Sequence, residues 1–216
     1  GIDGGVAGRN AEEVEKQADR WGTEGRVFSL DEAKKGIEGA DAVLNCAGPF
    51  SETHGALVDA CLAEGSDYLD ITGEVDVFES IACRDGEARD ADVTLVPGVG
   101  FDVVPSDCLV AYLAEKVEEP SYVAVALRTL PNVSPGTART VVESLGKNGV
   151  VRRDGELRDV PPAWKTRHAY FGDGRGKVEV TTMPLGDVVT AYRSTGVNNI
   201  ECYVDLPRPA RLLARS

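Results

Sequence analysis

The sequence has few of the residues that build metal sites, disulfides or membrane spans. Only two histidines occur, His54 and His168, and neither has the carboxylate or histidine spacing of a zinc site, so we expect no metal. The five cysteines show no CxxC pairing and mostly lie in apolar stretches, which favours buried free thiols. No apolar run approaches the roughly 20 residues of a membrane helix, and no basic and then apolar leader opens the chain. We therefore expect a cytoplasmic protein without a membrane span.

Positive charge is scarce as well. Acidic side chains number 36 against 23 basic ones, of which only 7 are lysines, and the formal net charge is −13. Most of such a surface repels phosphate, so we expect no nucleic-acid partner. An acidic, lysine-poor surface is typical of proteins adapted to high salt, where screening makes dense negative charge tolerable. The composition therefore indicates a halophilic source with an acidic proteome.

Strand and helix patterns alternate through the first half of the chain. A helix is expected from its cap at Asn10 to a stop at Gly22, and 41–47 forms a continuous apolar run typical of a strand covered on both faces. Strands are predicted at 26–30, 41–47, 66–71 and 92–98, and further helices at 31–39, 54–65, 75–91 and 105–119. This alternation predicts an open α/β domain with a parallel, Rossmann-like sheet over residues 1–119.

From about Pro120 the pattern changes. Residues 121–130 alternate like a strand, 134–149 fit a helix capped by Ser134, and 150–160 fit two strands joined by a turn at Asp154-Gly155. A loop rich in Pro and Gly (161–177) precedes a strand, a helix and a last strand. We expect a smaller α+β domain over residues 120–216, with a mixed or antiparallel sheet for substrate binding or dimerisation.

The opening GIDGGVAGRN places four glycines in eight residues, but a dinucleotide fingerprint needs a strand before its first glycine. The residues fit better as a loop that leads into a brief strand, Gly5–Ala7, followed by Arg9 and a capped helix. In a doubly wound nucleotide domain that is the place of the residue that contacts the adenosine ribose, an arginine where the ribose carries a 2′-phosphate. We therefore interpret this as the second strand of such a domain, without its N-terminal glycine-rich strand and turn.

An alternative hypothesis rests on two motifs, NCAG (45–48) and Tyr112-Leu-Ala-Glu-Lys116. Together they are similar to the motifs of short-chain dehydrogenases, in which a lysine one helical turn away lowers the pKa of a tyrosine hydroxyl. That mechanism also needs a serine before the tyrosine helix, and DVTLVPGVG has none. Tyr112 also fits a packing stripe with Leu109 and Leu113. We rank this alternative below the others.

Three segments after predicted strands have unusual compositions: AGPFSETHG, DITGE and PGVGFDVVPSD. Each alone fits an ordinary loop with helix-capping residues, Ser106 or Asp107 in the third case. Because ligands of open α/β sheets bind beyond the carboxyl ends of the strands, the three together predict a crevice along residues 48–50, 72–74 and 98–102.

These residues also carry a family resemblance. LNCAGPF, HGALVDACLAEGSDYLDITGE and VPGVGFDVVPSDCL resemble the saccharopine dehydrogenase family, especially its saccharopine-dehydrogenase-like oxidoreductases and trans-acting enoyl reductases. The likeness spans about residues 5–118, and SPGT (134–137) and PLGD with TAYRSTG (184–196) are similar to the family's second domain. The family begins with a strand and glycine turn that this sequence does not contain.

The resemblance implies an NAD(P)-dependent oxidoreductase that transfers hydride to or from a small amino-acid-derived or lipid-like substrate, with NADP favoured over NAD. Arg9 and Asn10 are implied at the adenosine ribose phosphate, and Gly100, Phe101 and Asp102 beside the reacting centre. The other cofactor-binding residues that the resemblance implies are Cys46, Ala47, Gly48, Pro49, Ile71, Thr72 and Gly73.

Several carboxyl, hydroxyl and imidazole groups are candidate proton carriers for such a reaction. Asp102 ranks first, as the catalytic residue, because Gly98, Gly100 and Pro105 tighten its loop. The remaining candidates are Asp70, Glu74, Tyr68 and His54. The rival hypothesis is a dinucleotide-binding or assembly protein without turnover. In either case we expect a homodimer, and a small-molecule substrate only for the enzyme.

Overall fold

The computed structural model describes residues 3–128, 148–174 and 176–206. By packing, the chain forms two compact units. Unit 1 comprises Gly1–Ile71 and Glu79–Val99, and unit 2 comprises Thr72–Phe78 and Gly100–Ser216. The predicted domains 1–119 and 120–216 follow chain order and stay a prediction, whereas packing assigns the helix after residue 103 to unit 2. None of the described helices combines the length and the apolar character needed to cross a bilayer.

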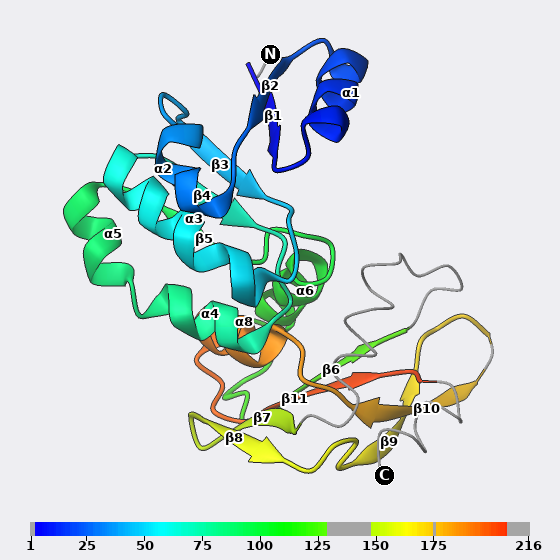
Figure 1. The fold of residues 1–216 in the computed structure, drawn as a ribbon. Coiled ribbons are helices and arrows are strands. Elements are labelled where there is room, and N and C mark those ends of the chain that lie inside the picture. Colours follow the sequence, from blue (N-terminus) through cyan, green and yellow to red (C-terminus); the bar gives the residue numbers. More distant parts are fainter. Residues whose placement is uncertain (1–2, 129–147, 175, 207–216) are drawn as a thin grey trace. The chain divides into compact units, whose positions relative to one another are not determined.

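Unit 1 begins with a small βαβ element (Figure 1), made of β1 (Gly5–Gly8), α1 (Ala11–Trp21) and β2 (Glu24–Val27). The two strands pair in parallel. The Asn10 side chain caps α1 by accepting hydrogen bonds from the backbone N–H groups of Glu12 (3.1 Å) and Glu13 (3.3 Å). Gly22, at φ 64°, ends the helix as predicted. The second strand lies slightly earlier than the predicted 26–30.

The rest of unit 1 is a three-stranded parallel sheet with helices. In the order β3-β4-β5, its strands are Ala42–Asn45, Asp67–Asp70 and Leu95–Val96. The helical elements along this part of the chain are η1 (Leu30–Glu32), α2 (Ala33–Gly36), α3 (Phe50–Glu64), α4 (Val75–Ala82) and α5 (Asp85–Ala91). The parallel βα arrangement is therefore confirmed, but the single helix predicted over 75–91 is wrong, because the chain breaks at Cys83 and Arg84.

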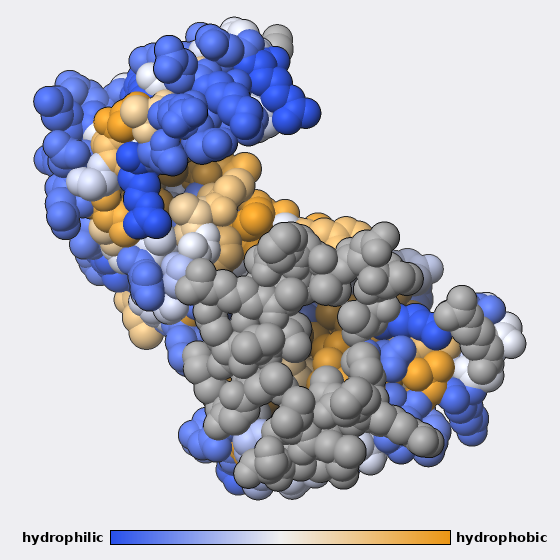
Figure 2. All heavy atoms as spheres, turned by 45° about the vertical axis from the view of Figure 1, so that its right-hand side comes forward, coloured by the Kyte–Doolittle hydropathy of each residue, from blue (hydrophilic) through white to orange (hydrophobic). Residues whose placement is uncertain are grey.

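The two faces of this sheet differ. Tyr68 lies on the face that packs against α3 and is fully buried. On the other face Leu44 is 56% exposed and Val96 38% exposed, and register places both beside Leu69. Figure 2 shows hydrophobic residues, coloured orange, at the surface of the molecule. The prediction that 41–47 is covered on both faces is thus wrong for the described residues.

Unit 2 is an α+β assembly on a six-stranded sheet, as the sequence predicted. Five strands follow the order β8-β7-β11-β10-β9 with antiparallel pairing, and β6 pairs in parallel with β11. The strands are β6 (Val123–Leu127), β7 (Gly149–Arg153), β8 (Glu156–Val160), β9 (Thr166–Tyr170), β10 (Lys177–Thr182) and β11 (Ile200–Val204). The predicted loop 161–177 therefore contains a strand, β9. Most of the helix predicted at 134–149 lies outside the described residues.

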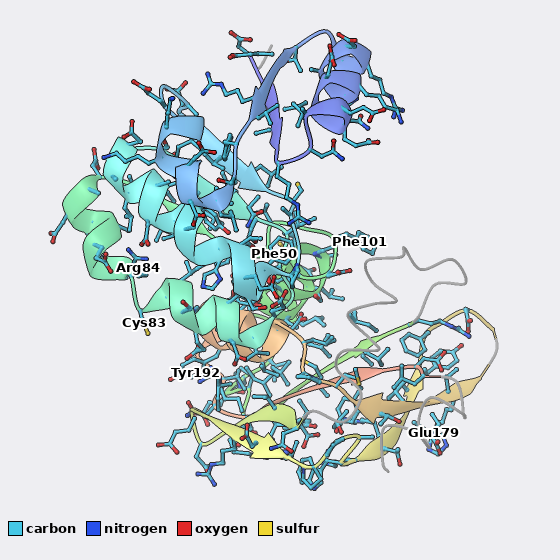
Figure 3. All side chains as sticks on the ribbon, in the orientation of Figure 1. Phe50, Cys83, Arg84, Phe101, Glu179 and Tyr192 are labelled. Atoms are coloured by element: carbon cyan, nitrogen blue, oxygen red, sulfur yellow. The ribbon has the colours of Figure 1, made fainter. Side chains whose placement is uncertain are left out.

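Two helices, α6 (Val104–Ala114) and α8 (Asp187–Thr195), pack against each other in unit 2. The core beneath them is aliphatic and aromatic, with Phe78, Val188 and Ile200 among its buried members. Arg152 on β7 donates to the Val188 carbonyl (2.8 Å) and stacks 4.1 Å from the ring centroid of Tyr192, which is labelled on α8 in Figure 3. Asp154 and Gly155, both at positive φ, form the predicted hairpin turn.

The packing at Gly186, where α8 begins, gives a first prediction. A Cβ at this position would lie 2.5 Å from the ring of Phe78, which is 3% exposed and enclosed by the core, while φ of −52° suits alanine. Gly186→Ala should therefore destabilise the protein by about 1–3 kcal/mol through overpacking alone. Urea unfolding measures this.

The matched control is Gly55→Ala in α3, where a Cβ meets nothing within 4 Å. Here the better helix propensity of alanine should stabilise the protein by up to about 1 kcal/mol. Equal effects of the two substitutions would contradict the packing argument.

Candidate active site

The carboxyl ends of β3, β4 and β5 lie side by side. Asn45 pairs with Asp70 in the parallel register, and Leu69 pairs with Val96. Each of the three predicted segments continues the chain from one of these ends. The expectation that the segments leave one edge of a parallel sheet is therefore confirmed by the strand order.

A buried hydrogen-bond network holds this edge. Asn45, Tyr68 and Asp70 are at most 3% exposed. The Asn45 side-chain amide donates to the Tyr68 hydroxyl (3.1 Å), and this hydroxyl donates to the Asp70 carboxylate (2.9 Å). The other Asp70 oxygen accepts the Gly98 backbone N–H (2.8 Å), and the Asp70 carbonyl accepts that of Val99 (2.7 Å). The end of β4 thus fixes the start of the segment after β5.

This network changes the roles of two candidate proton carriers. Burial raises the pKa of Tyr68, and the charge of Asp70 adds to that shift although the Asn45 hydrogen bond opposes it. Tyr68 is therefore a neutral hydroxyl near pH 7 and donates to Asp70. Because both side chains are enclosed, the geometry supports a positioning role for Tyr68 and Asp70.

The turn after β3 is shaped by its own side chains. Asn45 accepts the backbone N–H of Ala47 (2.9 Å), and the Thr53 hydroxyl donates to the Ala47 carbonyl (2.7 Å). Gly48-Pro49 is a cis peptide, after which α3 begins at Phe50. Cys46, Ala47 and Gly48 are exposed. The turn therefore presents small residues to solvent, as close approach of a ligand requires.

Arg9 and Asn10 differ in which side-chain groups are available to contact a ligand. The Asn10 carbonyl oxygen is used by the α1 cap, so only its NH₂ group is left to meet a ligand. Arg9 is exposed at the end of β1 and forms no ion pair or hydrogen bond within the described residues. Its guanidinium is thus available for an anion.

Thr72 and His54 are both held by local bonds. Thr72 is fully buried, and its hydroxyl accepts the Glu74 backbone N–H (3.0 Å), whereas Ile71 is 40% exposed. His54 Nδ1 contacts the Phe50 carbonyl (2.7 Å), so this nitrogen carries the proton, and Nε2 contacts the Ser80 hydroxyl (3.0 Å). His54 lies within α3 and is partly buried.

The segment Gly100–Phe101–Asp102 turns into α6 within unit 2. The Val104 N–H donates to the Gly100 carbonyl (3.1 Å), while Val103 is buried in the core. Phe101 is 80% exposed and is labelled in Figure 3, and Asp102 is also exposed. The helix begins at Val104, earlier than predicted, so neither Ser106 nor Asp107 is its N-cap.

A titratable residue near Asp102 was not found from sequence. Asp187, at the first position of α8, is fully buried, and neither carboxyl oxygen has a hydrogen-bond partner of ordinary geometry among the described residues. Burial, together with the charges of Asp107 and Asp102, raises its pKa to about 6, although the nearby Ser106 hydroxyl partly offsets the shift. The only sequence signal was its place in PLGD, which looks like an ordinary helix start.

The observed contact between Tyr112 and Lys116 does not support the short-chain dehydrogenase alternative. The Lys116 ammonium lies 5.1 Å from the centroid of the Tyr112 ring, a cation–π contact, and Tyr112 is 58% exposed. The stripe of Leu109, Tyr112 and Leu113 is also at least half exposed, so the packing role expected for it is wrong within the described residues.

The arginines that a dicarboxylate substrate would need are divided among separate contacts. Arg128 pairs with Asp173 and Asp205, Arg152 bonds within the core, and Arg153 pairs with Glu201. Arg139 lies outside the described residues. In the described part of the chain, no three His, Cys, Asp or Glu side chains gather as metal ligands would.

Comparison with known proteins supports the family resemblance. No protein-family model matches the chain. Over 141 residues the chain is 27% identical to the saccharopine dehydrogenase-like oxidoreductase of Homo sapiens, a match that covers 62% of this chain and 32% of the relative. Over 82 residues it is 37% identical to the trans-acting enoyl reductase of Mycobacterium ulcerans, covering 37% of this chain and 19% of the relative.

Among solved structures, the apo saccharopine dehydrogenase (L-Glu forming) from Saccharomyces cerevisiae matches with a TM-score of 0.65. The match covers 92% of this chain and 48% of the yeast chain at 13% identity. At that identity the likeness concerns the fold, and it confirms a Rossmann-like α/β part with an α+β part. The chain spans about a third of the human relative's length and about half of the yeast chain.

The Asp187 environment gives a pH prediction. An aspartate whose pKa is raised from 3.8 to about 6 makes the folded state bind its proton more tightly than the unfolded state does. The unfolding free energy should therefore fall as pH rises from about 4 to 6 and then level off. Asp187→Asn removes this loss and should stabilise the protein by roughly 2–3 kcal/mol at pH 7, but hardly at pH 4.

Urea unfolding over this pH range measures the difference. The control is Asp159→Asn, an exposed carboxylate on β8 of the same unit, which should leave the pH profile unchanged. A profile in which Asp187→Asn runs parallel to the unaltered protein from pH 4 to 7 would contradict the raised pKa.

Proposed function

We propose that the protein is an NADP-dependent oxidoreductase, with the dinucleotide along unit 1 and Asp102 as the proton carrier. The observation that carries the proposal is the parallel order β3-β4-β5, with a small-residue turn directly after β3 and, directly after β1, an exposed Arg9 that pairs with no described residue. Both features fit the residues that a doubly wound domain uses to hold a dinucleotide. When bound, this cofactor supplies the hydride.

The separation of the two sheets of unit 1 supports this proposal. The strands of a doubly wound sheet lie in the order 3-2-1-4-5-6, in which each number marks one place in the sheet. In unit 1, β2 and β1 correspond to places 3 and 2, and β3, β4 and β5 correspond to places 4, 5 and 6. Place 1 has no strand among the described residues, so β1 and β3 each keep one edge unpaired there. We infer that a strand at place 1 carries the glycine turn for the pyrophosphate.

The same inference accounts for the exposed sheet face. In a doubly wound domain, the helix after strand 1 covers one face of the sheet. Leu44 and Val96 lie on the face that no described helix covers, and both are large apolar side chains left in solvent. One strand-and-helix unit would therefore pair the two edges and bury this face.

The chain's own residues suggest a division of tasks. Arg9 would bind the 2′-phosphate with two parallel hydrogen bonds, and the small residues of the turn Cys46–Pro49 would let the dinucleotide approach the protein backbone closely. Tyr68 and Asp70 hold the edge rigid. Asp102, exposed on its turn, would move a proton to or from the substrate. The name of the mycobacterial relative suggests an enoyl group as one substrate class, and the human relative's name leaves the substrate open.

Four finer predictions of the sequence accompany this proposal: a preference for NADP over NAD, a homodimer, a cytoplasmic location and adaptation to high salt. What supports the last is the charge of −13. A protein equally stable in dilute buffer and in molar salt would contradict it.

Calorimetry of the full-length protein with NADPH and NADH tests the role of Arg9. A charge-assisted bond to the 2′-phosphate is worth about 1.5–3 kcal/mol, so Arg9→Gln should weaken NADPH binding about 10- to 100-fold and leave NADH binding unchanged. Arg20→Gln, an exposed arginine in the last turn of α1, is the control and should change neither. Equal affinity for NADPH and NADH in the unaltered protein would overturn the assignment.

Turnover tests the role of Asp102. In a panel of enoyl thioesters and of imines formed from amino acids and keto acids, NADPH consumption should occur with at least one substrate. Asp102→Asn should lower kcat by roughly 10²- to 10⁴-fold, whereas Tyr112→Phe should leave it unchanged. NADPH should raise the melting temperature of all three proteins alike. A melting shift without NADPH consumption in any assay would favour a binding protein without turnover.

A further inference from the structure

The two faces of β11 differ in chemistry. Ile200 and Cys202 belong to the apolar core of unit 2, and alternation along the strand turns Glu201 and Tyr203 to the opposite face. Glu201 is fully buried there. Burying a carboxylate on a sheet face costs free energy unless hydrogen-bond donors surround it, so we expect such donors around Glu201.

Four side chains donate hydrogen bonds to the Glu201 carboxylate. The Lys165 ammonium lies 3.0 and 3.1 Å from its two oxygens, Arg153 donates to one oxygen, and the hydroxyls of Tyr122 and Tyr203 donate to the other. Burial alone would raise the pKa of Glu201, but these donors and the charge of Arg153 lower it to about 2. Glu201 therefore carries its charge at neutral pH and holds its donors in fixed positions.

The cations around Glu201 outnumber it. Arg167 on β9 is the third cation: its guanidinium donates to the Tyr122 hydroxyl (3.4 Å) and lies 5.4 Å from the centroid of the Tyr203 ring. Within the described residues Arg167 has no carboxylate partner. Three cations against one carboxylate leave an excess of about two positive charges in a protein of net charge −13.

The neighbouring carboxylate on this face does not remove the excess. Glu156 stands opposite Arg153 in the β7–β8 register, but it pairs with Arg158 (3.7 Å), which also pairs with Asp154 (3.6 Å). Arg158 and its two partners thus form a separate group of one cation and two carboxylates. Glu179 on β10 belongs to the other face, since Val180 is the residue in register with Arg167.

Two aromatic rings flank the cations. Lys165 lies 5.6 Å and Arg153 5.9 Å from the centroid of Trp164, and Arg153 lies 5.9 Å from that of Tyr122. Trp164 is 43% exposed and Tyr122 42% exposed. Apolar ring surface therefore lies within reach of solvent beside unneutralised N–H donors.

We propose that Arg153, Lys165 and Arg167, together with Trp164 and Tyr122, form a binding site for a small organic carboxylate. The planar guanidinium of Arg167 matches the two oxygens of a carboxylate, and the half-exposed rings provide contact for the carbon skeleton beside it. Inorganic phosphate would satisfy the charge but has no carbon skeleton to contact the rings. Glu201 is the positioning residue that holds Arg153, Lys165 and Tyr122 in place. The site lies within unit 2 and does not depend on the proposed cofactor or reaction.

Tryptophan fluorescence tests this site directly. Trp21 and Trp164 are the two tryptophans of the chain, so in a Trp21→Phe background the emission reports Trp164 alone. Cyclohexanecarboxylate should shift this emission saturably, whereas its uncharged analogue cyclohexanecarboxamide and inorganic phosphate should half-saturate it only at concentrations at least 10-fold higher. No NADPH is present, so the result is independent of the cofactor proposal.

Variants in the same background locate the bound anion. Arg167→Gln and Lys165→Gln should each raise the half-saturating concentration about 10-fold or more, while Arg158→Gln, the matched control on the neighbouring strand, should change it less than 2-fold. Melting temperatures confirm that each variant is folded. Any of three results would overturn the proposal: no saturation by the carboxylate, equal binding of the carboxamide or of phosphate, or an equal loss in Arg158→Gln.

Discussion

The order of the candidate site depends on the carboxylate of Asp70. This single side chain accepts one hydrogen bond from its own strand, through Tyr68, and one from the backbone of Gly98. β5 is only two residues long, so its own ladder gives the following segment little definition. The Asp70 contacts replace the missing ladder bonds, and a buried charge that is well supplied with donors stabilises only the arrangement that supplies them.

The same edge shows why small and polar residues share it. Asn45 both donates to Tyr68 and accepts from Ala47, so the turn after β3 is tied to the network that fixes the segment after β5. The turn itself carries no bulky side chain before Pro49. A buried hydrogen-bond network fixes this edge, and an exposed turn of small residues lies next to it. This arrangement suits a ligand with a long phosphate-containing chain, since a preorganised backbone reduces the entropy cost of binding.

How far the sequence could predict this structure depended on whether the signal was local. The Asn10 cap, the Gly22 stop and the Asp154-Gly155 turn are local, and all three are confirmed. The break at Cys83 and Arg84 was not visible, because Arg84 forms ion pairs with Asp59 and Glu87, and the first of these is distant in sequence. β9 was not predicted because the prolines and glycines that flank it within 161–177 are typical of a loop.

The site residues divide in the same way. Gly48, Ile71 and Asp102 follow strand ends, and strand ends can be located from hydrophobic pattern. Asp187 and Glu201 are defined by neighbours from distant parts of the chain: Asp187 by α6, and Glu201 by Tyr122, Arg153 on β7 and Lys165. No spacing rule brings these partners together, because the pairing of strands sets the contacts. For the same reason, the scattered arginines of the second half gave no indication that Arg153 and Arg167 share a sheet face.

Glu201 and Asp187 are both buried carboxylates of unit 2, but their surroundings differ. Glu201 is surrounded by donors and has a pKa of about 2, whereas the Asp187 carboxylate has no hydrogen-bond partner among the described residues and has a pKa of about 6. An unsupported buried carboxylate opposes folding at neutral pH, and a neutral side chain of the same shape would avoid that cost.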